Sequence, residues 1–142
     1  MRVAVLHSKV TDASAPDELD VLAQVDAVSS ALKNLRHEPF PVPMSLDMAA
    51  AMTHLSREKP DFVFNLVEGL DGVGRFIYFA PAVLDQLGLP YSGSPTNAIY
   101  VSTNKILSKQ TLRQSDLPTP AWFNSNHQLQ RHPSFPPPYL IK

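Results

Sequence analysis

The sequence contains no cysteine, which excludes a disulfide framework, a thiolate zinc site and a cysteine nucleophile. Its 12 basic and 13 acidic side chains leave a formal net charge of −1, so no charge excess favours binding to nucleic acid or to an anionic membrane. No apolar run approaches the length of a transmembrane helix, and the run after Arg2 is too short for a signal peptide. These absences favour a cytoplasmic protein without nucleic-acid or membrane partners.

Glycine is scarce and unevenly placed. All five glycines lie between residues 69 and 93, which indicates close approach of the backbone to a ligand or to another element there. Six of the 14 prolines lie in the last 25 residues, which indicates that the compact domain ends near Asp116. We therefore predict one domain over residues 1–117 and a tail over residues 118–142 that belongs to a further domain.

Short apolar segments alternate with segments of helical period. The predicted strands are residues 2–6, 38–42, 61–67 and 89–91. The predicted helices are residues 17–36, a segment capped by Ser45, and residues 76–87. This alternation predicts an α/β fold, a doubly wound, Rossmann-like parallel sheet flanked by helices, with the proline-rich second strand at its edge. Such sheets bind ligands beyond the carboxyl ends of their strands.

The apolar period of the first helix predicts which of its side chains are buried. Its stripe consists of Val21, Leu22, Val25, Val28, Leu32 and Leu35. Pro16 and the acidic residues that follow it suit the start of a helix, where the partial positive charge favours carboxylates.

Common nucleotide and signalling motifs do not fit the sequence. A dinucleotide site needs a glycine-rich turn directly after the first strand, where residues 7–9 read His-Ser-Lys. Gly69, Gly72 and Gly74 lack the Lys-Ser/Thr ending of a phosphate-binding loop. A receiver-like signalling domain would need an aspartate at the end of the third strand, where Asn65 stands. The five histidines show no metal-ligand spacing.

Residues 88–120 contain, in this order, a short predicted strand, a Ser-Gly-Ser turn, two predicted helical segments and a Leu-Pro segment that follows the second helix. Their motifs are Gly88-Leu89-Pro90-Tyr91-Ser92-Gly93-Ser94, then Asn104-Lys105 with Lys109 one turn later, then Leu117-Pro118-Thr119-Pro120. In order and spacing they resemble the D-alanine–D-alanine ligase family of the ATP-grasp ligases, whose pattern is GIPYTGS, DK…TK and GLPTP. The resemblance implies a pre-ATP-grasp N-terminal domain over residues 1–117 and the truncated start of the ATP-grasp central domain over residues 118–142.

The resemblance also implies an activity for the full-length parent. Such a ligase converts a D-amino acid to an acyl phosphate that a second amine attacks, using ATP and Mg²⁺, in the synthesis of peptidoglycan precursors. The family's catalytic arginine and Mg²⁺ carboxylates would lie beyond Lys142, so no catalytic residue and no metal ligand is assigned here. We expect this chain alone to be inactive and to hold no cofactor. The alternative is a stand-alone, non-catalytic binding or interaction module with the same fold.

One branch of the family has the pattern N-x-x-E-G…G-R after the third strand, and Asn65, Glu68, Gly69 and Arg75 match it. By resemblance, this loop shapes the pocket of the first amino-acid substrate. Glu68 and Arg75 can pair across the turn and fix the loop while it presents backbone N–H groups. The alternative is a surface ion pair that only shapes the turn.

The remaining site residues are also implied by resemblance. Ser92 in the Ser-Gly-Ser turn is assigned to the substrate rim, and Glu18 is the nearest match to the glutamate that holds the substrate ammonium. The glycine pair and Ser-x-Glu pattern that accompany that glutamate are absent, so Glu18 is alternatively an ordinary acid at a helix start. Lys105 and Lys142 match the two ATP-binding lysines, whereas Lys109 is better read as a solvated helix lysine.

The tail carries aromatic and apolar residues, and the sheet of the central domain against which they would pack is expected to be missing from this chain. We predict that Trp122, Phe123, Tyr139 and Leu140 dock either on this domain or on a second copy, which would then be a homodimer.

Overall fold

The computed structural model describes residues 1–11, 16–123, 133 and 135–138. The chain forms two compact units, Met1–Thr103 and Asn104–Lys142, which are described separately. This division reflects packing within the chain, and the domain boundary expected after residue 117 stays a prediction. In the part of the chain that the structure describes, no helix is long and apolar enough to cross a bilayer.

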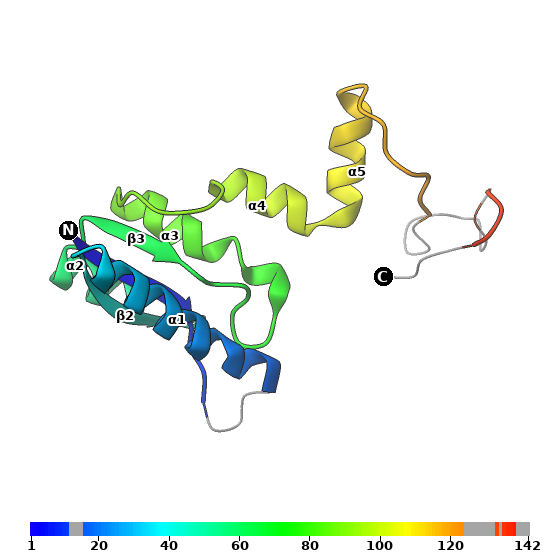
Figure 1. The fold of residues 1–142 in the computed structure, drawn as a ribbon. Helices are drawn as coiled ribbons and strands as arrows, with labels where there is room; N and C mark the ends of the chain where they lie inside the picture. Colours follow the sequence, from blue (N-terminus) through cyan, green and yellow to red (C-terminus); the bar gives the residue numbers. More distant parts are fainter. Residues whose placement is uncertain (12–15, 124–132, 134, 139–142) are drawn as a thin grey trace. The chain divides into compact units, whose positions relative to one another are not determined.

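A parallel sheet forms the centre of the first unit. It contains β1 (Arg2–Ser8), β2 (Glu38–Met44) and β3 (Phe62–Asn65) in the order β2-β1-β3 (Figure 1). Residues 3–6 of the central strand are buried, as expected for a strand covered on both faces. The proline-rich β2 lies at the edge, as predicted, because a strand with every second N–H missing cannot serve two neighbours.

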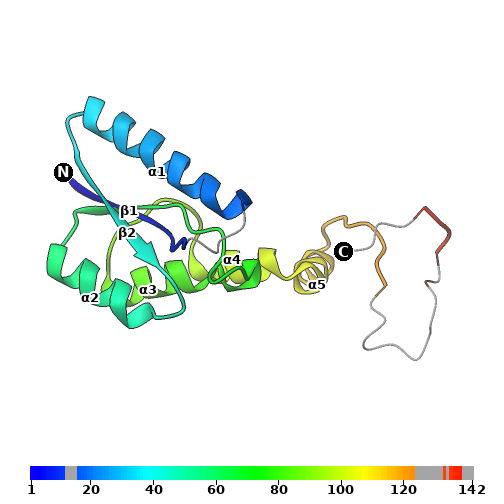
Figure 2. The ribbon, with the colours of Figure 1, turned by 90° about the horizontal axis from the view of Figure 1, so that it is seen from below.

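Helices cover both faces of this sheet. Helix α1 (Pro16–Asn34) lies on one face, and α2 (Met48–Glu58) and α3 (Phe79–Leu87) lie on the other (Figure 2). The predicted α/β class with a parallel sheet and flanking helices is confirmed, and a complete doubly wound sheet stays a prediction. The core between the sheet and the α2–α3 layer consists of Ala4, Leu6, Val42, Met44, Ala51, Leu55, Val63, Val67, Leu70, Ala80, Val83 and Leu84.

The predicted fourth strand is reduced to a single bridge. Tyr91 pairs in parallel with Val63, whose N–H donates to Pro90 O at 2.9 Å and whose carbonyl accepts from Ser92 N at 3.0 Å. The helix predicted from residue 76 begins later, at Phe79, after the short 3₁₀ turn η1 (Gly74–Phe76). A proline in the first turn of α3, at position 81, is tolerated because N–H groups there have no partner within the helix.

Three local predictions were wrong, namely the cap of α2 and the burial of Leu22 and of Leu35. The cap of α2 is Asp47, whose Oδ1 accepts from Ala50 N at 3.3 Å, while Ser45 Oγ accepts from Asp47 N at 3.3 Å. On α1, Val21 and Val25 are 7% exposed as predicted, but Leu22 is 43% exposed because it is turned about 100° from Val21.

Leu35 was also predicted to be buried and is 68% exposed. Helix α1 ends at Asn34, and Arg36 has a φ of 61°. Leu35 therefore lies beyond the end of the helix, and the helical period no longer places it on the buried face. Helix α4 (Thr96–Thr103) ends the first unit, and α5 (Lys105–Gln114) begins the second.

Candidate functional site

The carboxyl ends of the strands form the rim of the candidate site. In a parallel sheet these ends meet at one edge, to which the strand arrowheads point in Figure 1. Ser8 ends β1, Asn65 ends β3, and Ser92 follows the bridge that Tyr91 makes beside β3. The structure thus brings together three segments that are distant in sequence, including the predicted site residues Asn65 and Ser92.

Hydrogen bonds tie these segments to one another. Ser92 Oγ accepts from Asn65 N at 2.9 Å, and Asn65 Oδ1 accepts from Val67 N at 3.1 Å. On the other side, Ser8 Oγ donates to Gly69 O at 2.7 Å. Because the bonds made by the Ser92 and Ser8 hydroxyls join different segments, the rim is held in place before any ligand arrives.

The loop after β3 is a tight hairpin rather than an open glycine-rich loop. Leu70 and Val73 pair as an antiparallel bridge, with Val73 N donating to Leu70 O at 2.9 Å. Between them, Asp71 and Gly72 have φ values of 49° and 75°, which is the requirement of a two-residue hairpin turn and the reason that Asp-Gly suits it. The Leu70 side chain is fully buried in the core, so the hairpin is anchored to the sheet.

Gly69 is required by a close approach of the backbone. A Cβ at Gly69 would lie 3.0 Å from Gly74 Cα and 3.2 Å from Val73 C, both of them backbone atoms. The predicted close approach in this window is therefore confirmed at Gly69, and the contact is with the loop itself. A phosphate-binding role is not needed to explain this glycine.

Glu68 and Arg75 are exposed on this loop, and the pairing predicted for them was wrong. Among the described residues no ion pair joins them, and the Arg75 guanidinium carbon instead lies 5.2 Å from the centroid of the Phe76 ring. The loop is fixed by its bridge, by Leu70 and by the hydroxyl of Ser8. Two opposite charges are consequently presented at the rim without neutralising each other.

A second set of hydrogen bonds supports the Ser-Gly-Ser turn. Asp85 on α3 accepts from Tyr91 Oη at 2.8 Å and from Thr96 Oγ1 at 2.6 Å, so it holds both ends of the turn that contains Ser92. The Thr96 and Tyr91 hydroxyls lower the pKa of Asp85, in that order of effect. Burial of the ring, followed by its hydrogen bond to Asp85, raises the pKa of Tyr91.

The other predicted site residues lie elsewhere. Glu18 lies in the first turn of α1, but its side chain is outside the described part of the structure, and so is all of Lys142. Lys105 is exposed at the first position of α5, where Asn104 caps the helix by accepting from Leu107 N at 3.0 Å. Lys105 belongs to the second unit, so it is described apart from the rim.

Two features of the site were missed in the sequence. Ser8 was placed in the stretch that follows the first predicted strand and was given no role, and Asp85 was not singled out. The signal for Ser8 was its place at the carboxyl end of a buried strand, beside the predicted ligand edge. For Asp85 no local signal existed, because its partners lie 6 and 11 residues away on other elements.

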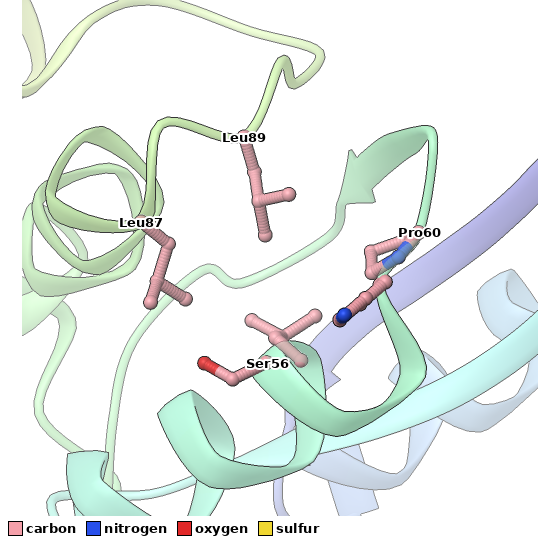
Figure 3. Close-up of a pocket in the computed structure, with 6 residues that line it drawn as sticks. Ser56, Pro60, Leu87 and Leu89 are labelled. Atoms are coloured by element: carbon pink, nitrogen blue, oxygen red, sulfur yellow. The ribbon is translucent and has the colours of Figure 1, made fainter.

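A separate hollow of about 290 Å³ lies at the opposite edge of the sheet, near the end of α2 and the start of β3. Figure 3 shows Leu87 and Leu89 across this hollow from Ser56 and Pro60. Its position away from Asn65 and Ser92 separates it from the candidate site. Among the described residues, no cluster of three His, Cys, Asp or Glu side chains is suited to holding a metal ion.

Comparisons with known proteins give relatives but no matching family model. A D-alanine–D-alanine ligase of Moorella thermoacetica is 32% identical over 104 residues, which cover 71% of this chain and 32% of that protein. A D-alanine–D-alanine ligase of Gluconobacter oxydans is 31% identical over 143 residues, which cover 100% of this chain and 45% of that protein.

An uncharacterised protein of Sinorhizobium fredii is 34% identical over 103 residues, which cover 67% of this chain and 30% of that protein. The chain therefore spans less than half of the length of these curated relatives. The similarity to the Gluconobacter protein extends from the central sheet through α5 into the proline-rich segment.

Proposed function

Because the chain belongs to a D-alanine–D-alanine ligase-like family, we propose that it is the N-terminal, substrate-binding part of an ATP-dependent carboxylate–amine ligase. The whole protein would activate the carboxylate of a D-amino acid as an acyl phosphate and let a second amine attack it. Its place would be the cytoplasmic synthesis of peptidoglycan precursors.

The observation that carries the proposal is the shared rim of the loop after β3 and the Ser-Gly-Ser turn. The 2.9 Å hydrogen bond between Asn65 N and Ser92 Oγ joins the two motifs that resemble the family's substrate region. Glu68 and Arg75 stand exposed at this rim and offer a negative and a positive group. An amino acid carries an ammonium and a carboxylate, so its charges are complementary to this pair.

ATP chemistry is assigned to the whole protein. When ATP is bound, phosphoryl transfer builds negative charge that fixed ammonium groups offset, and Lys105 and Lys142 are the residues proposed for this role. The described residues do not fit a Mg²⁺ site, since they offer no cluster of carboxylates, and no step is routed through the ion. We propose that this chain by itself forms no dipeptide.

The proposal is tested by titrating the isotope-labelled chain with D-alanine and following backbone amide resonances by NMR. We expect shifts in residues 65–75 and at Ser92, weaker binding in Glu68→Gln, and little response to L-alanine. Glu38→Gln is the matched control, because this exposed glutamate begins β2 at the opposite edge of the sheet.

Two outcomes of these measurements would contradict the proposal. Absence of shifts at the rim, or equal binding of both enantiomers, would contradict the substrate assignment. A coupled assay for ADP release with D-alanine should show no turnover by this chain, and turnover would contradict the inactivity that we propose.

A further inference from the structure

The end of α5 reverses the direction of the chain. Asp116 has a φ of 55°, Asp116 N donates to Arg113 O at 3.2 Å, and Leu117 N donates to Leu112 O at 2.9 Å. These two bonds and the left-handed residue are the Schellman motif that ends many helices. The reversal brings Thr119, Pro120 and Trp122 back alongside α5.

Lys109 holds this returning segment. Its ammonium donates to Thr119 Oγ1 at 3.2 Å and to Pro120 O at 2.9 Å, and the side chain is half-buried. The nitrogen also lies 5.6 Å from the centroid of the Trp122 ring. The Arg113 guanidinium carbon lies closer to the same ring centroid, at 4.2 Å. Both distances are within the range of a cation–π interaction.

These contacts give Lys109 a role that its sequence position did not suggest. An ammonium has three protons, and two of them are used on acceptors of the returning segment. The prediction of a solvated helix lysine was therefore wrong. For Trp122, the prediction that it docks within the chain agrees with its place on α5, whereas Tyr139 and Leu140 lie outside the described residues.

We propose that Lys109 is a positioning residue: its ammonium fixes the path of residues 119–122 along α5 and thereby the position of the Trp122 ring. Arg113 assists by holding the indole ring. The proposal rests on contacts within the second unit alone, so it stands or falls independently of the ligase function.

The single tryptophan of the chain provides the test, since Lys109 and Arg113 both lie against its ring. The variant Lys109→Met keeps the aliphatic stem and removes the donors. We expect it to raise the acrylamide quenching constant of Trp122 about twofold to fivefold, because losing one exposed cation–π contact increases the population with an unprotected indole by about that factor. Lys109→Arg should restore most of the protection, because a guanidinium can both donate and stack. Far-UV circular dichroism should stay unchanged.

Lys33→Met is the matched control, because it removes an ammonium from the last turn of α1 in the first unit. Thr119→Val removes one acceptor and keeps the charge, so it should give a smaller rise and covers the case in which Lys109→Met fails to fold. Wild-type protection in both Lys109→Met and Thr119→Val would overturn the proposal. An equal rise in Lys33→Met would overturn it as well.

Discussion

Replacing Gly69 by alanine is the most direct test of the architecture of the site. The added Cβ would lie 3.0 Å from Gly74 Cα, 3.2 Å from Gly74 N and 3.2 Å from Val73 C. All three are backbone atoms in a hairpin that is closed by its own bridge and anchored by the buried Leu70, so they cannot move aside as a flexible side chain would. We expect a loss of about 1–3 kcal/mol in the free energy of unfolding, the usual cost of overpacking.

The matched control is Gly74→Ala in the same loop. A Cβ there would meet only Glu68 O at 4.0 Å, and Gly74 does not have a positive φ. This change should be neutral or stabilise by about 0.4–1 kcal/mol, because alanine restricts the unfolded chain. Urea denaturation followed by far-UV circular dichroism measures both variants. Equal stability of the two would refute the inference that the loop is closed by backbone contact at Gly69.

Three further predictions concern single side chains. Ser92→Ala should cost about 1–3 kcal/mol in urea denaturation, since it leaves the part-buried Asn65 N–H without its acceptor, and wild-type stability would contradict this. Because the pKa of Asp85 is lowered in the folded state, its contribution is complete above the unfolded pKa and is lost as pH falls through the folded pKa. Asp85→Asn should therefore lose less stability than the wild type on acidification, and parallel pH profiles would refute this. Asp116→Gly should raise the stability of α5 by roughly 0.5–1 kcal/mol, because glycine adopts its φ of 55° without strain, and a lowered thermal midpoint would contradict the cap assignment.

The two proposals concern different parts of the chain and are tested by different signals. Amide shifts at the rim report on amino-acid binding in the first unit, whereas quenching of Trp122 reports on the second. Either result therefore leaves the other proposal intact.

The sequence by itself determined the class of fold and pointed to the edge of the sheet at which the candidate site lies. A buried apolar run marked β1 as a central strand, and alternate prolines placed β2 at the sheet edge. Both patterns are local, because an apolar run and alternate prolines can each be recognised within the few residues of a single strand. The family resemblance was local too, because it rests on contiguous motifs in residues 88–120, and homologous ligases confirm it.

Only the tertiary structure decided which groups meet. Two neighbouring residues, Ser45 and Asp47, could each cap α2, and the course of the backbone selected Asp47. The need for glycine at position 69 comes from the later return of the chain, and the role of Lys109 comes from the reversal at Asp116. A hydrogen bond or steric contact depends on the distance between atoms in space, and residue type and spacing leave that distance open until the chain has folded.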